Sequence, residues 1–344
     1  MSPQVVFRTD ASNRIGGGHL VRCLSLAEEF ASHGWSVTLL TRRETLELFP
    51  FVSNVGFLHL QLLDEPDFYP GKNPPADLLI VDHYDLDVRY ESSARDFVQK
   101  ILVIDDLANR RHDCDFLIDQ SAGRCREDYE ALVPLDAKIF VGPKYGLLRP
   151  QFRIRRKHAL KKIAEINRVK KILINFGAAD GKRMTSFTLR AIAQTGLKAH
   201  LDIVVRAGVE RSQNLDELCR RTNCSYTFHS DVTDMASLML KADMAVGAGG
   251  TSSLERCCMG LPTVVIGTAE NQLVQSKALQ ALGAQSYLGL WSTITVDILA
   301  EEIIYLCSDH DKRISIKKSG MEVCDGHGAS RLLSHIMLAD KKIT

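Results

Sequence analysis

Short, continuous apolar runs alternate with amphipathic segments from the beginning of the chain. Residues 5–8 and 36–41 have the pattern of buried strands. Between them, apolar residues recur at intervals of three and four, as on one face of a helix, and Gly34 follows in the position of a C-terminal cap. These apolar positions are Leu20, Cys23, Leu24, Ala27, Phe30 and Ala31. Strand, helix and strand in this order predict a parallel crossover unit.

The same alternation continues through the first half of the chain. Residues 76–82 and 100–106 are continuous apolar runs that end in acidic residues, and residues 87–98 between them have helical character. Strands that are apolar on both sides are typical of a parallel sheet covered by helices on both faces. We therefore expect an α/β domain with a doubly wound sheet over residues 1–152.

A second round of strands and helices follows. We expect strands at residues 170–180 and 201–208, a helix at about 185–195, and a strand, a glycine loop, a helix and another strand within residues 243–267. This predicts a second doubly wound, Rossmann-type domain over residues 153–326, and a C-terminal helix within 327–344 that can pack back on the first domain. Two such domains would face each other across a cleft, and ligands of parallel α/β sheets bind at the carboxyl ends of the strands.

Composition narrows the class of protein. The 344 residues are 45% apolar and 25% charged, with a formal net charge of +1, as in an ordinary globular protein. No apolar run approaches the roughly 18 residues that span a bilayer, and the first residues lack the core of a signal peptide. The basic stretch 153–171 has no interleaved aromatic residues, so a solvated surface explains it better than a polyanion site. We expect a cytoplasmic protein that binds neither nucleic acid nor membrane.

Neither the cysteines nor the acidic triplets indicate a metal site. The nine cysteines show no C-x-x-C pair and no zinc-like spacing, which is typical of reduced and mostly buried thiols. The D-x-D triplets at 85–87 and 113–115 match a metal motif of some sugar transferases, but matches of three residues are frequent by chance. We expect neither a metal nor a cofactor.

The glycine cluster at 247–253 is the first candidate for ligand binding. It follows an expected strand at 244–246 and precedes an expected helix at 254–259. Glycines let a ligand approach the backbone, and the unpaired amides of a helix start, at the positive end of the helix dipole, bind anions. The candidate contacts for a diphosphate are Gly249, Gly250, Thr251 and Ser252. No lysine stands where the loop of ATPases requires one.

Two polar residues lie close to this loop in the sequence. Glu255 falls in the first turn of the expected helix, where it either interacts with the helix dipole or accepts bonds from ribose hydroxyls. Asn271 follows the strand expected at 263–267. It serves either as a helix N-cap or as an amide that contacts the substrate.

The loop Gly16-Gly17-Gly18-His19 is the second candidate. A tight turn from strand to helix explains the glycines without any function. Alternatively, Gly17 and Gly18 give a substrate access to the backbone, and His19 acts as a general base. The first turn of a helix favours the neutral imidazole that a base requires. Further polar residues at the ends of expected strands are Asp10, Asp82, His83, Tyr84, Asp105 and Asp106. Tyr84 is placed to bond a sugar hydroxyl or to anchor its own loop.

Several motifs together resemble those of the PseG family. They are "RTDASNRIGGGHLVRCLSLA", "IVDHYDLD", "VIDDLANRRHDCDFLIDQ", "GPKYGLLRP", "INFGAAD" and "GAGGTSSLERCCMGLP" with "ENQ" downstream. Members of this family are UDP-2,4-diacetamido-2,4,6-trideoxy-β-L-altropyranose hydrolases of pseudaminic acid biosynthesis. The resemblance runs from Arg8 to about Gln272, and it implies the two-domain GT-B fold of MurG-like glycosyltransferases.

The resemblance also implies roles for individual residues. His19 stands where the family has the base that deprotonates water for attack on the anomeric carbon, with inversion and release of UDP. Residues 249–252 match the diphosphate loop and Glu255 matches the acid that binds ribose. Asn271 and Tyr84 match residues that contact the substrate. The loop reads Thr-Ser-Ser-Leu where relatives often carry Ser-Thr-Ser-Trp, which leaves the phosphate chemistry intact.

Two alternatives to a hydrolase fit the same sequence features. A glycosyltransferase of the same fold would use the same UDP site with an acceptor hydroxyl in place of water. A nucleotide-sugar binding or scaffold protein would need no histidine base. The sugar itself cannot be derived from spacing rules, because one methyl or acetamido group changes contacts within the pocket.

Overall fold

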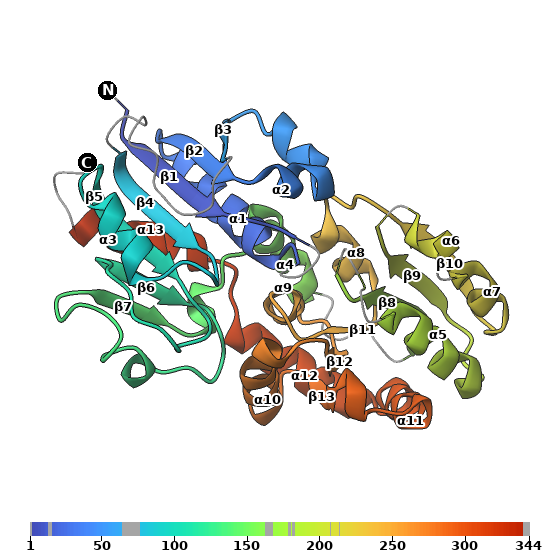
Figure 1. Cartoon of the computed structure of the whole chain (residues 1–344). Coiled ribbons are helices and arrows are strands. Elements are labelled where there is room, and N and C mark those ends of the chain that lie inside the picture. The colour runs from blue at the N-terminus through green and yellow to red at the C-terminus, as the bar shows by residue number, and fades with distance from the viewer. Residues whose placement is uncertain are drawn as a thin grey trace. The chain divides into compact units, whose positions relative to one another are not determined.

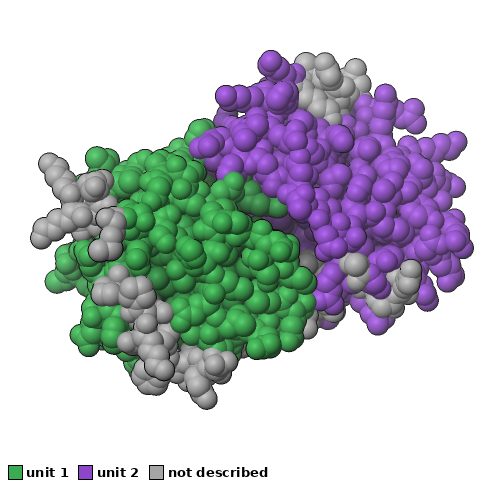
Figure 2. All heavy atoms as spheres, turned by 90° about the horizontal axis from the view of Figure 1, so that it is seen from above, with its two compact units in different colours: residues 1–149, 327–344 green, residues 150–326 purple. Residues whose placement is uncertain are grey.

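The computed structural model describes residues 2–12, 16–63, 76–161, 168–177, 180, 183–206, 208–212 and 214–339 (Figure 1). The chain divides into two compact units, each built around one parallel sheet. Unit 1 comprises residues 1–149 and 327–344, and unit 2 comprises residues 150–326 (Figure 2).

Within the described residues, unit 1 has a seven-stranded parallel sheet in the order β3-β2-β1-β4-β5-β6-β7. Its strands are β1 (Gln4–Thr9), β2 (Ser36–Thr41), β3 (Leu58–Leu62), β4 (Ala76–Asp82), β5 (Val98–Ile104), β6 (Phe116–Asp119) and β7 (Lys138–Val141). The strand order reverses between β1 and β4, and their register pairs Thr9 with Asp82. Ligands of open parallel sheets bind at such a reversal, outside the carboxyl ends of the strands.

The helices of unit 1 are α1 (Gly18–Ser32), α2 (Arg43–Leu48), α3 (Val88–Ala94) and α13 (Gly328–Ala339), with short 3-10 turns η1 (Pro50–Asn54), η2 (Arg126–Asp128) and η3 (Pro143–Tyr145). The helix expected at 87–98 is therefore shorter, because β5 already begins at Val98. The C-terminal helix α13 contacts α1 and η3. Leu332 and Ile336 of α13 share one buried apolar cluster with Leu20 and Leu26 of α1, which joins the end of the chain to the first unit.

Within the described residues, unit 2 has a six-stranded parallel sheet in the order β10-β9-β8-β11-β12-β13. Its strands are β8 (Lys171–Asn175), β9 (His200–Val204), β10 (Ser225–His229), β11 (Met244–Ala248), β12 (Thr263–Gly267) and β13 (Ser286–Leu290). The strand order reverses between β8 and β11. The sheet of unit 2 therefore repeats the design of unit 1.

The helices of unit 2 are α4 (Pro150–Lys161), α5 (Met184–Thr195), α6 (Val209–Ser212), α7 (Leu215–Arg220), α8 (Met235–Lys241), α9 (Ser252–Met259), α10 (Leu273–Ala281), α11 (Val296–Ser308) and α12 (His310–Val323), with 3-10 turns η5 (Glu270–Gln272) and η6 (Trp291–Thr293). No helix in the described part of the chain combines the length and the apolar character that crossing a membrane requires.

The basic stretch 153–171 is not one continuous helix. Its first part belongs to α4, its last residue opens β8, and residues 162–167 lie outside the described residues. The guanidinium of Arg156 donates to the carbonyls of Cys258, Met321 and Cys324. This cation therefore holds α4 on unit 2. The expected domain boundary after residue 152 falls inside α4, which begins two residues earlier.

Candidate active site

His19 forms a buried pair with Asp82. The histidine lies in the first turn of α1, Asp82 is the last residue of β4, and both are almost completely buried. His19 Nδ1 is 2.5 Å from Asp82 Oδ1. An ionised carboxylate only accepts hydrogen bonds, so in the neutral form of the ring this contact places the hydrogen on Nδ1 and the lone pair on Nε2. This arrangement orients a histidine for base chemistry at Nε2.

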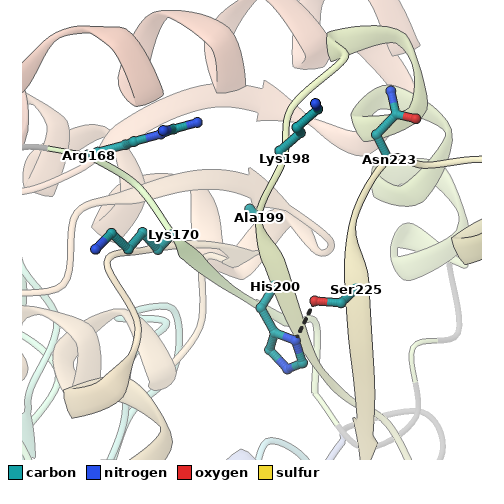
Figure 3. A pocket seen from close by; sticks show the side chains of 7 residues that line it. All are labelled: Arg168, Lys170, Lys198, Ala199, His200, Asn223 and Ser225. Carbon is teal, nitrogen blue, oxygen red and sulfur yellow. Dashed lines mark hydrogen bonds between the residues drawn. The ribbon is translucent and has the colours of Figure 1, made fainter.

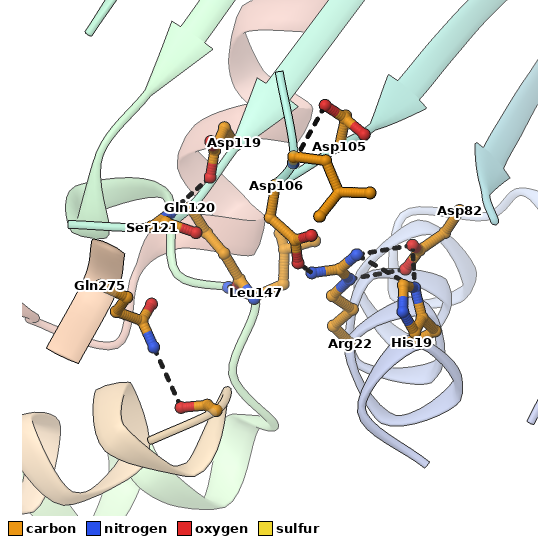
Figure 4. Close-up of polar contacts among 12 residues, drawn as sticks. His19, Arg22, Asp82, Asp105, Asp106, Asp119, Gln120, Ser121, Leu147 and Gln275 are labelled. Carbon is orange, nitrogen blue, oxygen red and sulfur yellow. Dashed lines mark hydrogen bonds and ion pairs between the residues drawn. The ribbon is translucent and has the colours of Figure 1, made fainter. Parts of the chain in front are cut away.

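Arg22, one helical turn after His19, keeps Asp82 ionised. Its Nε and Nη2 donate to the two oxygens of Asp82, each over 2.6 Å, and its Nη1 donates to Asp106 Oδ2 over 2.7 Å (Figure 4). Burial raises the pKa of Asp82, but the charge of Arg22 and the hydrogen bonds from Arg22 and His19 outweigh it and hold that pKa well below its usual range. The carboxylate that orients His19 is therefore a stable anion.

Tyr84 completes the group of residues around His19. Its hydroxyl donates to Asp106 Oδ1 over 3.0 Å, and its ring meets the ring of His19 edge to face with 4.3 Å between centroids. His19, Asp82, Arg22, Asp106 and Tyr84 thus form a closed ring of contacts, which we call the His19 ring. Within it the phenol is bonded to protein, so the loop-anchoring role weighed for Tyr84 is present in the structure.

The sequence identified four members of the His19 ring as candidates or as polar strand ends, but it missed Arg22. The available signal was its spacing, because residues three positions apart lie on the same face of a helix. Asp105, another acidic residue at a strand end, stands outside the ring and pairs with Arg110 Nη1 over 2.6 Å.

A second buried histidine, His83, is engaged at both ring nitrogens. Its Nε2 is 3.2 Å from Asp10 Oδ2, and its Nδ1 accepts the amide hydrogen of Asp85 over 3.1 Å. Burial raises the pKa of Asp10, whereas His83 and Arg8 lower it by more, so Asp10 is also ionised. The polar neighbours described for His19, Asp82 and Arg22, in contrast, both lie at Nδ1. His19 is thus the better candidate for a base.

Local packing already accounts for two glycines of the first loop. Gly16 has a φ of 74°, which favours glycine. A Cβ at Gly17 would lie 2.4 Å from the ring of Phe49, so a side chain there would displace that ring. Gly18 opens α1. Contacts of Gly17 and Gly18 with a substrate remain predictions.

The second glycine loop is shorter than expected. Strand β11 continues to Ala248 and α9 already begins at Ser252, so residues 249–251 form the connection. Gly247 is a strand residue, and a Cβ there would lie 2.5 Å from the carbonyl oxygen of Asn175 on the neighbouring strand. The Thr251 side chain makes no capping bond to α9.

Two glutamines of the following helical segment hold this loop. Gly249 N donates to Gln272 Oε1 over 3.2 Å, and Gln275 Nε2 donates to the carbonyls of Gly249 and Gly250 over 3.0 and 3.1 Å. Neither glutamine was assigned a role from the sequence, although Gln272 directly follows the candidate Asn271. Asn271 lies in η5, and Gln272 is the N-cap of α10, so the capping role considered for Asn271 is wrong.

Glu255 lies in the first turn of α9, as expected, and is buried. The acidic triplets have structural partners: Asp87 accepts the amide hydrogen of Arg89, while Asp113 and Asp115 both pair with Arg95. Within the described ranges, no three His, Cys, Asp or Glu residues are grouped so that they could hold a metal ion.

A cavity of about 500 Å³ lies elsewhere on unit 2 (Figure 3). Arg168, Lys170, Lys198 and His200 are among the residues that line it, at or before the first residues of β8 and β9. The cavity therefore lies at the amino ends of the strands. The candidate loop follows the carboxyl end of β11, which is the other end of the strands in the same parallel sheet. It is not the candidate site.

The chain is similar in structure to MurG of Acinetobacter baumannii. The likeness has a TM-score of 0.70, covers 97% of this chain and 99% of that protein, and comes with 14% sequence identity. The chain has the GT-B fold. This confirms the expected fold class of two Rossmann-type α/β domains.

Three curated proteins are similar to the chain in sequence, each over part of its length. The chain is 29% identical over 199 residues to the spore coat polysaccharide biosynthesis protein SpsG of Bacillus subtilis, which is 57% of either chain. It is 31% identical over 154 residues to the UDP-2,4-diacetamido-2,4,6-trideoxy-beta-L-altropyranose hydrolase of Campylobacter jejuni, with 43% of this chain and 53% of that protein aligned. An uncharacterized protein of Methanocaldococcus jannaschii is 23% identical over 268 residues, 76% of this chain and 55% of that protein. The chain thus spans slightly more than half the length of these relatives. No protein-family model matches it.

Proposed function

We propose that the protein hydrolyses a UDP-linked diacetamido-trideoxy hexose to UDP and the free sugar, with inversion at the anomeric carbon, as a step of pseudaminic acid biosynthesis. The observation that carries the proposal is the buried pair of His19 and Asp82, in which Nδ1 is bonded to a carboxylate and Nε2 is left for base chemistry. The similarity to the Campylobacter jejuni hydrolase supports the choice of substrate.

In the proposed reaction, His19 Nε2 takes a proton from water. The water oxygen bonds to the anomeric carbon while the bond from that carbon to the diphosphate oxygen breaks. UDP leaves with the electron pair of that bond, and the imidazolium is stabilised by Asp82. A positioned base of this kind contributes about 10²- to 10⁴-fold to the rate. The step uses side chains and water, and it requires no cofactor.

The leaving diphosphate is assigned to the start of α9. The amides and hydroxyls of Thr251 and Ser252, next to Gly249 and Gly250, would bind its oxygens and stabilise their negative charge. Glu255 is assigned to the ribose hydroxyls. We assign contacts with the sugar to Gly17, Gly18, Tyr84 and Asn271.

The test is incubation of the purified protein with UDP-linked diacetamido-trideoxy hexose without any acceptor. We expect equal amounts of UDP and free sugar, with the inverted anomer formed first, as followed by NMR spectroscopy. Release of UDP only after addition of an acceptor would overturn the proposal in favour of a glycosyltransferase. Tight binding without release under either condition would favour a nucleotide-sugar binding protein.

The variant His19→Ala tests the base separately from the binding site. It should lose turnover while UDP affinity, measured by calorimetry, stays within about threefold, because the diphosphate is assigned to unit 2. Turnover that survives in this variant would show that the base is another group.

A further inference from the structure

Arg256 lies buried directly beneath the loop to which the diphosphate is assigned. The residue is 3% exposed. Its Nη2 donates to the carbonyl of Ala248 over 2.6 Å and to Ser253 Oγ over 2.9 Å, while its Nη1 donates to Ser252 Oγ over 3.0 Å. The guanidinium therefore connects the end of β11 to the first turn of α9, on the two sides of the loop.

This cation has no carboxylate partner among the described residues. Its Nε is buried and finds no hydrogen-bond partner among them. Arg22, buried to the same degree, differs because it is paired with Asp82 and Asp106. Burial lowers the pKa of Arg256 to about 10, and Cys257 and Glu255 oppose this only in part. A buried charge without a counter-ion is costly for the fold, so an anionic ligand close by would offset that cost.

The missing side chain of Gly247 leaves space for the guanidinium of Arg256. A Cβ at Gly247 would lie 3.0 Å from Arg256 Nη1 as well as 2.5 Å from the carbonyl oxygen of Asn175. Glycine at position 247 thus lets the cation reach the end of β11. This explains a glycine that the sequence alone had assigned to the ligand loop.

Ser252 is the route by which the charge can reach a ligand. Its hydroxyl oxygen accepts a hydrogen bond from Arg256. Ser252 is the first residue of α9, and its side chain is half-buried. A hydroxyl whose oxygen accepts from a cation is a stronger donor through its own hydrogen. The hydroxyl of Ser253 points back to the carbonyl of Ala248, over 3.5 Å, and is not placed in the same way.

We propose that Arg256 is a positioning residue of the anion site, a buried cation that strengthens binding of the diphosphate through Ser252. The inference rests on the proposed function, since it assumes that the loop of residues 249–252 holds the diphosphate of the substrate. The positive charge that complements the diphosphate is thereby assigned to a side chain beneath the loop rather than to a lysine or arginine on the surface.

The experiment compares the affinities of uridine, UMP and UDP by calorimetry for the parent protein, Arg256→Gln and Arg256→Lys. Arg256→Gln should weaken UDP binding roughly 10- to 30-fold, as expected for charges several ångströms apart in a partly buried site. UMP should be weakened less and uridine less than threefold, because the effect scales with ligand charge. Arg256→Lys should recover part of the loss and keep a steeper salt dependence than the glutamine variant.

Arg313 supplies the matched control. It is equally buried, and its Nη1 donates to the carbonyls of Leu306 and Cys307, distant in sequence from the loop. Arg313→Gln should lower the melting temperature and leave the ratio of UDP to uridine affinity unchanged. If Arg256→Gln fails to fold, Ser252→Ala removes the hydroxyl instead and should lose UDP affinity selectively in a folded protein.

Each outcome decides between explanations. Equal loss of uridine, UMP and UDP binding would overturn the proposal, because Arg256 would then only hold the loop in shape. Unchanged UDP binding in a folded Arg256→Gln variant would overturn it as well, while leaving the proposed hydrolysis intact. A parent protein that does not bind UDP would overturn both the proposed function and this inference.

Discussion

Atoms Nδ1 of His19 and Oδ1 of Asp82 lie 2.5 Å apart, although 63 positions separate the two residues in the chain. The contact forms because α1 starts beside the carboxyl end of β1, and β4 is the neighbour of β1 in the sheet. A carboxylate at this position holds one ring tautomer of the histidine and leaves the other nitrogen to act on water.

Replacing Asp82 by Asn should therefore impair turnover more than binding. The amide can turn its NH₂ group towards Nδ1, which moves the ring hydrogen to Nε2 and removes the base. We expect kcat to fall about 10²- to 10⁴-fold with a small change in KM, measured by UDP release. His83→Gln is the control, because both nitrogens of that ring are already engaged in the fold. If His83→Gln lost activity as severely as His19→Ala in a folded protein, the choice between the two histidines would be wrong.

Arg22 should matter for stability as well as for activity. Arg22→Gln leaves the buried carboxylates of Asp82 and Asp106 without their cation, so we expect the free energy of unfolding to fall by about 3–5 kcal/mol in urea denaturation. Arg89, whose side chain is 88% exposed in its pair with Asp87, is the matched control. Arg89→Gln should leave the urea midpoint of unfolding essentially unchanged, because exposed ion pairs contribute little to stability. Similar effects of the two substitutions would contradict the role given to Arg22.

The pH dependence of stability should reveal Asp119. Burial raises the pKa of this carboxyl to about 6 from a usual value of 3.8, against the hydrogen bonds of Ser121 and Tyr129. As pH rises from about 4, the carboxyl of Asp119 ionises first in the unfolded chain. The free energy of unfolding therefore falls until this carboxyl also ionises in the folded protein, near pH 6. One pKa unit corresponds to about 1.4 kcal/mol, which limits the loss to about 3 kcal/mol.

Asp119→Asn removes this titration and keeps an oxygen that can accept from Tyr129. The free energy of unfolding is measured by urea denaturation for both proteins at pH 4 and at pH 7. The value for the parent minus that for the variant should be larger at pH 4 than at pH 7, by up to about 3 kcal/mol. A difference between the two proteins that stays constant over this range would contradict the raised pKa.

Neighbouring glycines of the second loop should respond differently to a methyl group. A Cβ at Gly249 would lie 2.3 Å from Ser276 Oγ, whereas at Gly250 the nearest atom is 3.6 Å away, an ordinary contact. Gly249→Ala should cost about 1–3 kcal/mol of stability by overpacking and weaken UDP binding by moving the loop. Gly250→Ala should be close to the parent in melting temperature. Equal melting temperatures for the two variants would show that α10 yields to the added methyl group.

The sequence alone predicted the fold class and the central strands of both sheets, whereas the outer strands β3, β6, β7, β10 and β13 were not predicted. Continuous apolar runs such as 76–82 and the helical spacing after His19 depend only on local periodicity, so β4 and α1 could be predicted directly. The ends of the strands and helices differ from the predicted ones, because tertiary contacts determine where each element stops. Strand β11 extends to Ala248 since Gly247 can lie against the carbonyl of Asn175 on β8.

Which polar residues meet was decided only by the tertiary structure. The sequence proposed His19 without its partners, because Asp82 ends β4 and Asp106 follows β5, far from His19 in the chain. The role of Arg22 becomes visible only in its contacts with both carboxylates. Likewise, local pattern could not show that Gly17 accommodates the ring of Phe49. A hydrogen bond between distant residues depends on strand order and on the packing of a helix against the sheet, and neither is encoded in the periodicity of one segment. Local pattern therefore determined the scaffold, and long-range packing decided the chemistry that the scaffold holds.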